Sequence, residues 1–297
     1  MTIDTPEDAP DEVPDPEQPG TADRSPWLTE FTAPDGTTHA VRRLVLPGGE
    51  RFDAEFVAIA QPLEFDRCPL CLALNPRRRE HIPPESVGGT VLTRTCERCN
   101  SLAGSRLEAD FADWVHDRLP TRFTHNKIQG QRRGPRIQIL ETHEGQPVLL
   151  FEGEQCDPAV PEMLRLGGEV NVEFTTPDPD RSHLAAIKSA YLSACLIVQA
   201  IPETPEAEAI RQVLLTAIET PRHQPVPMTG LPDGMWLARI PGPGVRGEAA
   251  LVRVTIEGGG EPKFAIMLAR KILVAWPIGG NLVGTDANDN VTFALPM

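Results

Sequence analysis

Four of the six cysteines in the 297-residue chain form two Cys-x-x-Cys pairs, a spacing that could bind a metal ion. The first pair is Cys68 and Cys71, and after a gap of 24 residues the second is Cys96 and Cys99. Each pair can fold as a tight knuckle that directs two thiolates to one point, and two knuckles complete the tetrahedron that Zn²⁺ accepts. Because four protein ligands leave no open coordination position, we expect a structural Zn²⁺ that contributes folding energy. Chance pairs and redox-active pairs are the alternative interpretations.

An acid and a histidine, Glu80 and His81, lie between the two cysteine pairs, and Asn100 directly follows the second pair. Hydrolysis of a phosphodiester needs a cation near the phosphate and a base that accepts a proton from water. A carboxylate and an amide carbonyl are hard oxygen ligands of the kind that Mg²⁺ or Mn²⁺ takes, and a histidine can accept a proton near neutral pH. These three residue types could therefore support metal-assisted hydrolysis.

The cysteine segment resembles the HNH endonuclease family, the ββα-metal nucleases. The similarity lies in the pattern C-x2-C, E-H-x-x-P-x-S-x-G-G, C-x2-C-N and G-x3-acid. Its residues here are Cys68, Cys71, Glu80, His81, Pro84, Ser86, Gly88, Gly89, Cys96, Cys99, Asn100, Gly104 and Glu108. The resemblance covers roughly residues 67–118, about a sixth of the chain, and implies a treble-clef-like ββα-metal module around a structural four-cysteine zinc.

The same resemblance implies catalytic roles for three residues. His81 would be the general base, and Glu80 and Asn100 would hold a catalytic Mg²⁺ or Mn²⁺. Two departures from the family pattern are visible. Asn100 stands where many members have a histidine, and Val91 stands where the middle asparagine is usual. The first changes the expected metal ligands, and the second puts the order of the loop and the catalytic competence in doubt.

The elements around this motif must bring its two halves together. We expect the second knuckle to place Asn100 at the start of a helix, with the strand that carries Glu80 and His81 lying across from it. Neighbours on a regular strand point to opposite faces, so both side chains reach one site only if the chain bends near Glu80. Pro83 and Pro84 make a regular strand improbable there, without proving the bend.

Further candidates are weaker, and each has an ordinary structural interpretation. Glu108 lies two helical turns beyond Asn100 and is either a site carboxylate or a salt-bridge partner. Asn100 itself could simply cap a helix. The run Arg77, Arg78 and Arg79 precedes the acid–histidine pair and could contact phosphate, although such runs are usually solvated. Gly88 and Gly89 are expected to form a turn.

The charge of the chain is unevenly distributed. The net charge is −14, but residues 67–136 carry thirteen Lys or Arg and seven Asp or Glu, a net of +6. A basic region in an acidic protein is a possible nucleic-acid footprint. Arginine dominates with 24 residues against 4 lysines, which suits phosphate but equally fits a GC-rich genome.

The pattern along the chain predicts an α+β protein with four parts. Residues 1–26 are acidic, proline-rich and expected to be disordered. Residues 27–66 read as strands, residues 67–120 as the HNH module ending in a helical segment, and residues 121–297 as a larger α+β domain. Within that domain, residues 180–201 form the clearest amphipathic helix, a second helix covers 205–219, and strands flank both.

We therefore expect a metal-dependent endonuclease that acts on DNA, with RNA not excluded. The alternative is a non-catalytic, zinc-stabilised module that binds nucleic acid or protein. A third possibility places the main function in residues 121–297, as an oligomerisation or target-recognition domain. No stretch of 18 apolar residues occurs, and the acidic N-terminus is unlike a secretory signal, which favours a cytoplasmic protein without membrane association.

Overall fold

The computed structural model of the protein combines helices with antiparallel sheets, which confirms the predicted α+β class. It describes residues 28–32, 38–45, 51–116, 118–123, 136–141, 147–152, 172–174, 176–240, 249–256, 261–279, 281–285 and 291–294. Side chains are described for residues 51–116, 176–240, 249–256 and 261–279. The acidic tail predicted for residues 1–26 lies outside the described residues.

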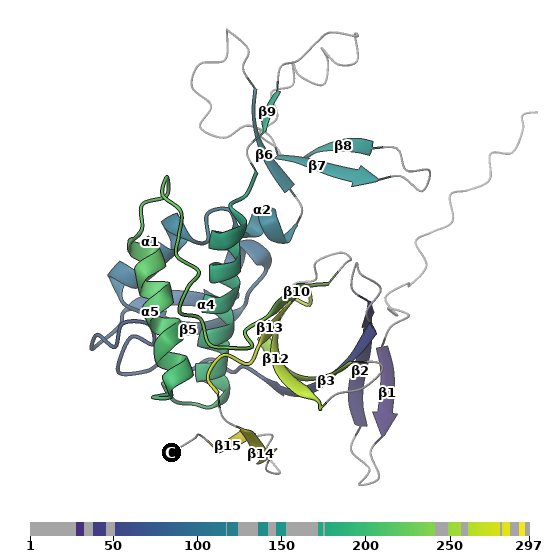
Figure 1. The fold of residues 1–297 in the computed structure, drawn as a ribbon, viewed down its shortest axis with the longest axis vertical. Helices are drawn as coiled ribbons and strands as arrows, with labels where there is room; N and C mark the ends of the chain where they lie inside the picture. Colours follow the sequence, from purple (N-terminus) through teal and green to yellow (C-terminus); the bar gives the residue numbers. More distant parts are fainter. Residues whose placement is uncertain are drawn as a thin grey trace, which may run out of the picture.

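The largest sheet has seven antiparallel strands and joins distant parts of the chain (Figure 1). Its spatial order is β1 (Leu28–Thr32), β2 (Thr38–Val45), β3 (Arg51–Ile59), β11 (Ala249–Ile256), β12 (Lys263–Leu268), β13 (Ile272–Ala275) and β10 (Leu237–Arg239). The strands before the cysteine segment and those near the C-terminus thus meet at the β3–β11 pair, where Phe52 lies opposite Ile256.

Three smaller sheets complete the β structure. The hairpin of β4 (Arg78–Ile82) and β5 (Val91–Thr95) carries the acid–histidine pair. The others are β8-β7-β6-β9, made of β6 (Arg118–Phe123), β7 (Arg136–Glu141), β8 (Pro147–Glu152) and β9 (Val172–Phe174), and the pair β14 (Asn281–Thr285) with β15 (Val291–Ala294).

The helical segment expected at the end of the cysteine module is interrupted. Helix α1 spans Glu97–Arg106 and a short α2 spans Phe111–Val115, with a 3-10 turn, η1, at Glu85–Val87. Leu107 and Phe111, on either side of the break, are both fully buried. Their burial needs no continuous helix, because the bend between α1 and α2 directs both toward the core.

The two predicted C-terminal helices are confirmed, with starts that their sequences explain. Helix α4 spans Pro179–Ile197 and α5 spans Pro205–Glu219. The side chains of Asp178 and Thr204 each accept a hydrogen bond from the backbone amide three residues later. Each of the two residues is followed by a proline at the first helical position. These are the residue types that begin helices.

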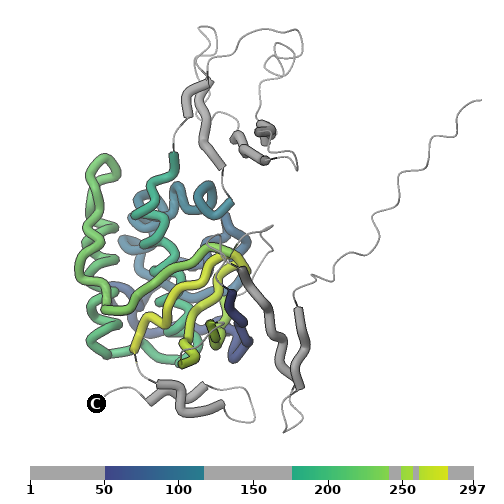
Figure 2. The backbone as a smooth tube through the Cα atoms, turned by 45° about the vertical axis from the view of Figure 1, so that its right-hand side comes forward, coloured from purple at the N-terminus to yellow at the C-terminus, as the bar shows by residue number. Residues whose placement is uncertain are grey.

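Helix α4 is the central element of the described structure. It contacts β11, β12 and β13 on one side and α2, α5 and β4 on the other. Figure 1 shows it between α5 and the large sheet, and Figure 2 shows the helices together on one side of the yellow strands. Every residue from Leu184 to Ile197 is buried. Because both sides are covered, even the polar side chain of Lys188 lies in the interior, 1% exposed.

Candidate functional site

The four cysteines of the two Cys-x-x-Cys pairs come together as the spacing predicts. Their Sγ atoms all lie within 4.8 Å of one another, and the Sγ atoms of Cys71 and Cys96 are 3.5 Å apart. None of the four forms a disulfide. A tetrahedral Zn²⁺ with Zn–S bonds of about 2.3 Å needs sulfur atoms about 3.8 Å apart. The cluster therefore fits a structural zinc ion.

Backbone turns hold both knuckles. The amide of Leu72, at φ 61°, donates to the carbonyl of Cys68. In the second knuckle Cys96 is the N-cap of α1, and its Sγ accepts a hydrogen bond from the amide of Cys99 at 3.4 Å. Sulfur atoms that accept amide protons are stabilised as thiolates, the form that binds metal.

The protonation of the sulfur cluster also favours a cation. A hydrogen bond from Cys99 outweighs burial and lowers the pKa of Cys68 to about 5, whereas burial raises the pKa of Cys71 to about 11. A Zn²⁺ ion would displace the remaining thiol protons and bring the others to the thiolate form.

The strand that carries the acid–histidine pair is regular, which corrects the expected bend. Residues Arg78 to Ile82 pair in unbroken register with Thr95 to Val91. Neighbours on such a strand point to opposite faces. Glu80 is accordingly buried at 4% exposure, whereas His81 is half-buried on the other face, opposite Leu92. Pro83 and Pro84 follow the strand rather than interrupt it.

Glu80 and Asn100 do meet, on the buried side of the hairpin. The Nδ2 atom of Asn100 donates to Oε2 of Glu80 at 3.0 Å and to the carbonyl of Arg79 at 3.1 Å. The hydroxyl of Thr95 donates to the same Oε2 atom at 3.1 Å. The residue after the second knuckle therefore connects α1 to β4, and through it the cysteine cluster to the acid–histidine pair.

A lysine from the distant helix α4 completes this buried cluster. The Nζ atom of Lys188 lies 2.6 Å from Oε1 of Glu80 and 2.5 Å from Oε1 of Glu108. Burial alone would lower the pKa of Lys188, but the two carboxylates reverse this and raise it above its ordinary value. Burial, with the neighbouring charge of Glu80, raises the pKa of Glu108, although Lys188 opposes that shift. The ammonium of Lys188 thus pairs with two carboxyl groups, which hold it in the charged form. The carboxyl of Glu108 is harder to ionise than an exposed glutamate.

Sequence reasoning did not identify Lys188. A signal was present, because it is one of four lysines in the chain and sits in the middle of an otherwise apolar stretch of helix. A lysine that far inside a packed helix is almost never fully buried without a partner. The pattern could not say which acids would be its partners.

The outward face of the hairpin is basic. Arg79 and His81 of β4 lie on this face, together with Leu92 and Arg94 of β5. The residues between them on each strand are buried on the other face. Arg94 pairs with Glu64 at 2.6 Å. The imidazole of His81 forms no hydrogen bond or ion pair with any residue whose side chain is described.

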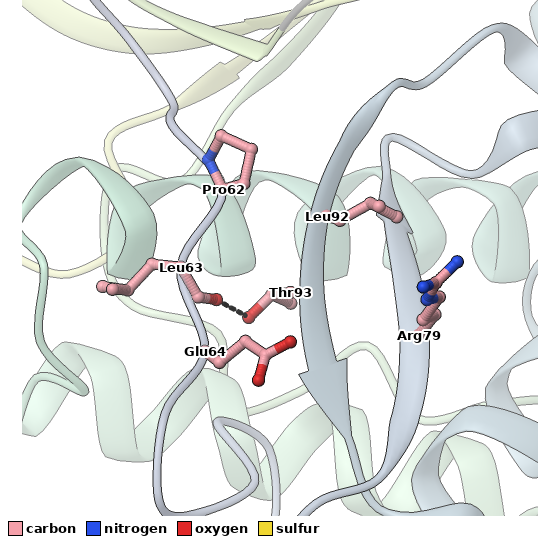
Figure 3. A pocket seen from close by; sticks show the side chains of 6 residues that line it. All are labelled: Pro62, Leu63, Glu64, Arg79, Leu92 and Thr93. Carbon is pink, nitrogen blue, oxygen red and sulfur yellow. Dashed lines mark hydrogen bonds between the residues drawn. The ribbon is translucent and has the colours of Figure 1, made fainter.

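A pocket of about 310 Å³ opens beside this face. Figure 3 shows Arg79 and Leu92 on the two strands, and Pro62, Leu63 and Glu64 on the segment that runs past them. That segment is held to β5 by the hydroxyl of Thr93, which donates to the carbonyl of Leu63 at 2.8 Å. Since Leu92 is the cross-strand neighbour of His81, the pocket adjoins the predicted base.

The three arginines before the acid–histidine pair have different surroundings. Arg79 lines the pocket and is exposed. Arg78 forms an exposed ion pair with Glu97 at the start of α1. The carbonyl of Arg77 accepts a hydrogen bond from Arg94. Their contact with phosphate stays a prediction, and Arg79 is the one that shares a face with His81.

The two glycines of the motif form the predicted turn for separate reasons. Gly88 ends η1 with φ 89°, a left-handed conformation that favours glycine. A Cβ atom on Gly89 would lie 1.6 Å from the carbonyl oxygen of Pro83. The close approach of backbone to backbone therefore excludes any larger residue at Gly89.

A catalytic divalent ion, implied by the resemblance, does not fit the described arrangement of Glu80. Its two oxygens already accept hydrogen bonds from Lys188, Thr95 and Asn100. An ion that bound there would have to displace the ammonium of Lys188, which is itself fully enclosed. The roles of Glu80 and Asn100 as ligands of such an ion stay a prediction.

No protein-family model, curated protein or solved structure matches the chain. Among the described residues, no helix is both long and apolar enough to cross a membrane. The functional argument therefore depends on the geometry of the cysteine segment and its neighbours.

Proposed function

We propose that the chain is a zinc-stabilised nuclease of the HNH type that hydrolyses phosphodiester bonds of DNA, with His81 as the general base. The observation that carries the proposal is the outward face of the β4–β5 hairpin. There a half-buried histidine without a described hydrogen-bond partner lies two residues along β4 from Arg79, whose cross-strand partner is Arg94, and a pocket opens beside them.

The cysteine cluster and the buried polar cluster support this face from behind. The knuckle at Cys96 and Cys99 starts α1, and Asn100 ties α1 to the backbone of Arg79 and to Glu80. Glu80 immediately precedes His81 on β4. A rigid strand below the imidazole is what a general base requires, because small displacements of a base from its water cost large factors in rate.

The chemistry assigned to each residue follows from its charge and exposure. Arg79 is exposed and can form two parallel hydrogen bonds with a phosphate. Arg94, already paired with Glu64, would add positive charge near the same phosphate. His81 would take the proton of the attacking water, and the displaced sugar oxygen would leave as an alcohol after protonation by solvent.

DNA is the proposed substrate because phosphate contacts by arginine are independent of base sequence. The hairpin face offers no feature that selects a 2′-hydroxyl, so single-stranded RNA is a second substrate to include in the assay. The affinity should fall steeply with salt, in proportion to the number of phosphates contacted.

The experiment compares wild type with His81→Ala on supercoiled plasmid, in Mg²⁺, in Mn²⁺ and in buffer freed of divalent ions. We expect wild type to nick or cut the plasmid, and His81→Ala to be slower by a factor of about 10² to 10⁴ with its zinc content unchanged. His223→Ala is the matched control, since His223 is an exposed histidine outside the hairpin. Equal cleavage by wild type and His81→Ala would refute the assignment.

One observation favours the second candidate, a zinc-stabilised module that binds nucleic acid without cutting it. Lys188 occupies the carboxylate of Glu80, so the site lacks a free acidic ligand for a metal ion. On that reading the arginines bind phosphate and His81 is a surface residue. Retarded migration of plasmid DNA by wild type, with no cleavage under any ionic condition, would establish this candidate.

A further inference from the structure

We propose that the ammonium group of Lys188 is the permanent cation of the Glu80–Glu108 cluster and that it excludes a divalent metal ion from this position. The inference goes beyond the proposed nuclease activity and does not depend on it, because it concerns which cation the folded chain holds.

The geometry places Lys188 where a cation would sit. Its Nζ atom lies between carboxylate oxygens of Glu80 and Glu108, at 2.6 and 2.5 Å. The side chains of Lys188 and Glu80 are 2% and 5% exposed, so neither charge is shared with solvent. Thr95 and Asn100 complete the cluster through their hydrogen bonds to Glu80.

The same residues would form a recognisable metal site if the lysine were absent. The two carboxylates and the hydroxyl of Thr95 supply the hard oxygen atoms that Mg²⁺, Mn²⁺ and Ca²⁺ prefer. With the lysine in place the carboxylates have a monovalent partner that is covalently part of the chain. A metal ion would have to expel that ammonium from both carboxylates, at the cost of a buried unpaired charge.

The lysine comes from the central helix α4, which also packs on the large sheet. Displacing it would disturb the packing of α4 on β4, and α4 is buried along most of its length. The exclusion is therefore a property of the fold rather than of a flexible surface side chain. Lys188 is a positioning residue: it holds the carboxylate of Glu80 toward Asn100 and hence β4 against α1.

A purely structural ion pair makes a different prediction. If Lys188 only adds stability, its removal should weaken the fold and leave metal binding unchanged. If it occupies a cation position, its removal should open a site for one divalent ion. Metal binding, measured apart from any cleavage, separates the two.

The test titrates the full chain, with zinc bound at the cysteines, with Mn²⁺. Electron paramagnetic resonance measures the unbound Mn²⁺ and so gives the amount bound per chain. We expect wild type to bind no Mn²⁺ at the Glu80–Glu108 cluster, so wild type and Glu80→Gln should bind equal amounts of Mn²⁺. Lys188→Met should bind about one additional Mn²⁺, and the double variant Lys188→Met, Glu80→Gln should lose it. Lys263→Met is the matched control, because Lys263 is an exposed lysine on β12 and its change should create no site.

Stability in the presence of the ion gives a second measurement in case Lys188→Met folds poorly. Mn²⁺ should raise the melting temperature of Lys188→Met and leave that of wild type unchanged, because an ion that binds only the folded chain stabilises it. If Lys188→Met stays unfolded even with Mn²⁺, Lys188→Gln, which keeps a polar side chain at this position, takes its place in both measurements.

Three results would overturn the inference. One is a Mn²⁺ ion bound to wild type and lost in Glu80→Gln. Another is a folded Lys188→Met that gains no ion. The third is a melting temperature of wild type that Mn²⁺ raises and that Glu80→Gln makes insensitive to Mn²⁺, which would leave the proposed nuclease intact while removing Lys188 as the resident cation. Loss of His81-dependent cleavage alone would affect only the proposed nuclease.

Discussion

The Nζ atom of Lys188 lies 2.6 Å from the Oε1 atom of Glu80, so a helix from the C-terminal half of the chain reaches the motif that the cysteine pairs enclose. The motif is therefore not a self-contained module. Its buried acid pairs with a lysine of helix α4, which packs on the large sheet, and the stability of the two parts should be coupled.

The first prediction concerns that coupling. Lys188→Met should reduce the free energy of unfolding by about 3 to 5 kcal/mol, because it leaves two buried carboxyl groups without their cation. Denaturant unfolding without divalent ions measures the loss. Adding Glu108→Gln should recover part of it, since only one carboxyl then stays buried. Strictly additive effects of the two changes would show that Lys188 and Glu108 do not interact.

Zinc should be required for the folded cysteine segment. Purified protein should contain about one Zn²⁺ per chain, and Cys68→Ser or Cys96→Ser should lose both the metal and the cooperative unfolding of this segment. Elemental analysis and thermal unfolding measure the two effects. Cys195→Ala is the control, because Cys195 is buried in α4 and lies outside the four-sulfur cluster. A folded wild-type chain without zinc would contradict the prediction.

The turn between β4 and β5 should depend on one glycine and not on another in the same motif. Gly89→Ala should cost about 3 kcal/mol or more, because its Cβ would collide with the Pro83 carbonyl. Gly104→Ala should be neutral or add up to about 1 kcal/mol, since its Cβ on α1 would meet nothing within 4 Å and alanine favours a helix. Denaturant unfolding of Gly89→Ala and Gly104→Ala measures both free energies of unfolding. Equal values would show that the backbone of Gly89 does not approach Pro83 so closely.

The pH dependence of stability should contain a contribution from His183. Burial is the main cause that lowers its pKa; Arg239 acts in the same direction and Asp180 opposes both. A histidine with a lowered folded pKa binds protons more tightly when unfolded, so its contribution is present above its unfolded value of about 6.5 and is lost as the pH falls below it.

His183→Phe keeps a ring near Trp114, which His183 contacts edge-on with ring centroids 5.2 Å apart, and removes the titration. Between pH 7.5 and 5.5, wild type should therefore lose more melting temperature than the variant. Parallel pH profiles of the two proteins would exclude a titrating role for His183.

Several features could be predicted from the chain because they are local. The spacing of the cysteine pairs is enough to bring four sulfur atoms together, since each knuckle is closed by its own backbone. Helices α4 and α5 begin at capping residues followed by proline, and their apolar spacing extends over several turns. The proximity of Asn100 to Glu80 is also predictable, because the second knuckle joins α1 to β5 and β5 is the hairpin partner of β4.

What only the tertiary structure decided involves residues far apart in sequence or a choice between two faces. The register of β4 with β5 places Glu80 inside and His81 outside, and no local pattern distinguishes that from a bent strand. The pairing of β3 with β11 joins residues from opposite ends of the chain. The burial of Lys188 against Glu80 and Glu108 depends on how α4 packs, because a lysine in an apolar helix is neutralised by whichever acids the fold brings within reach.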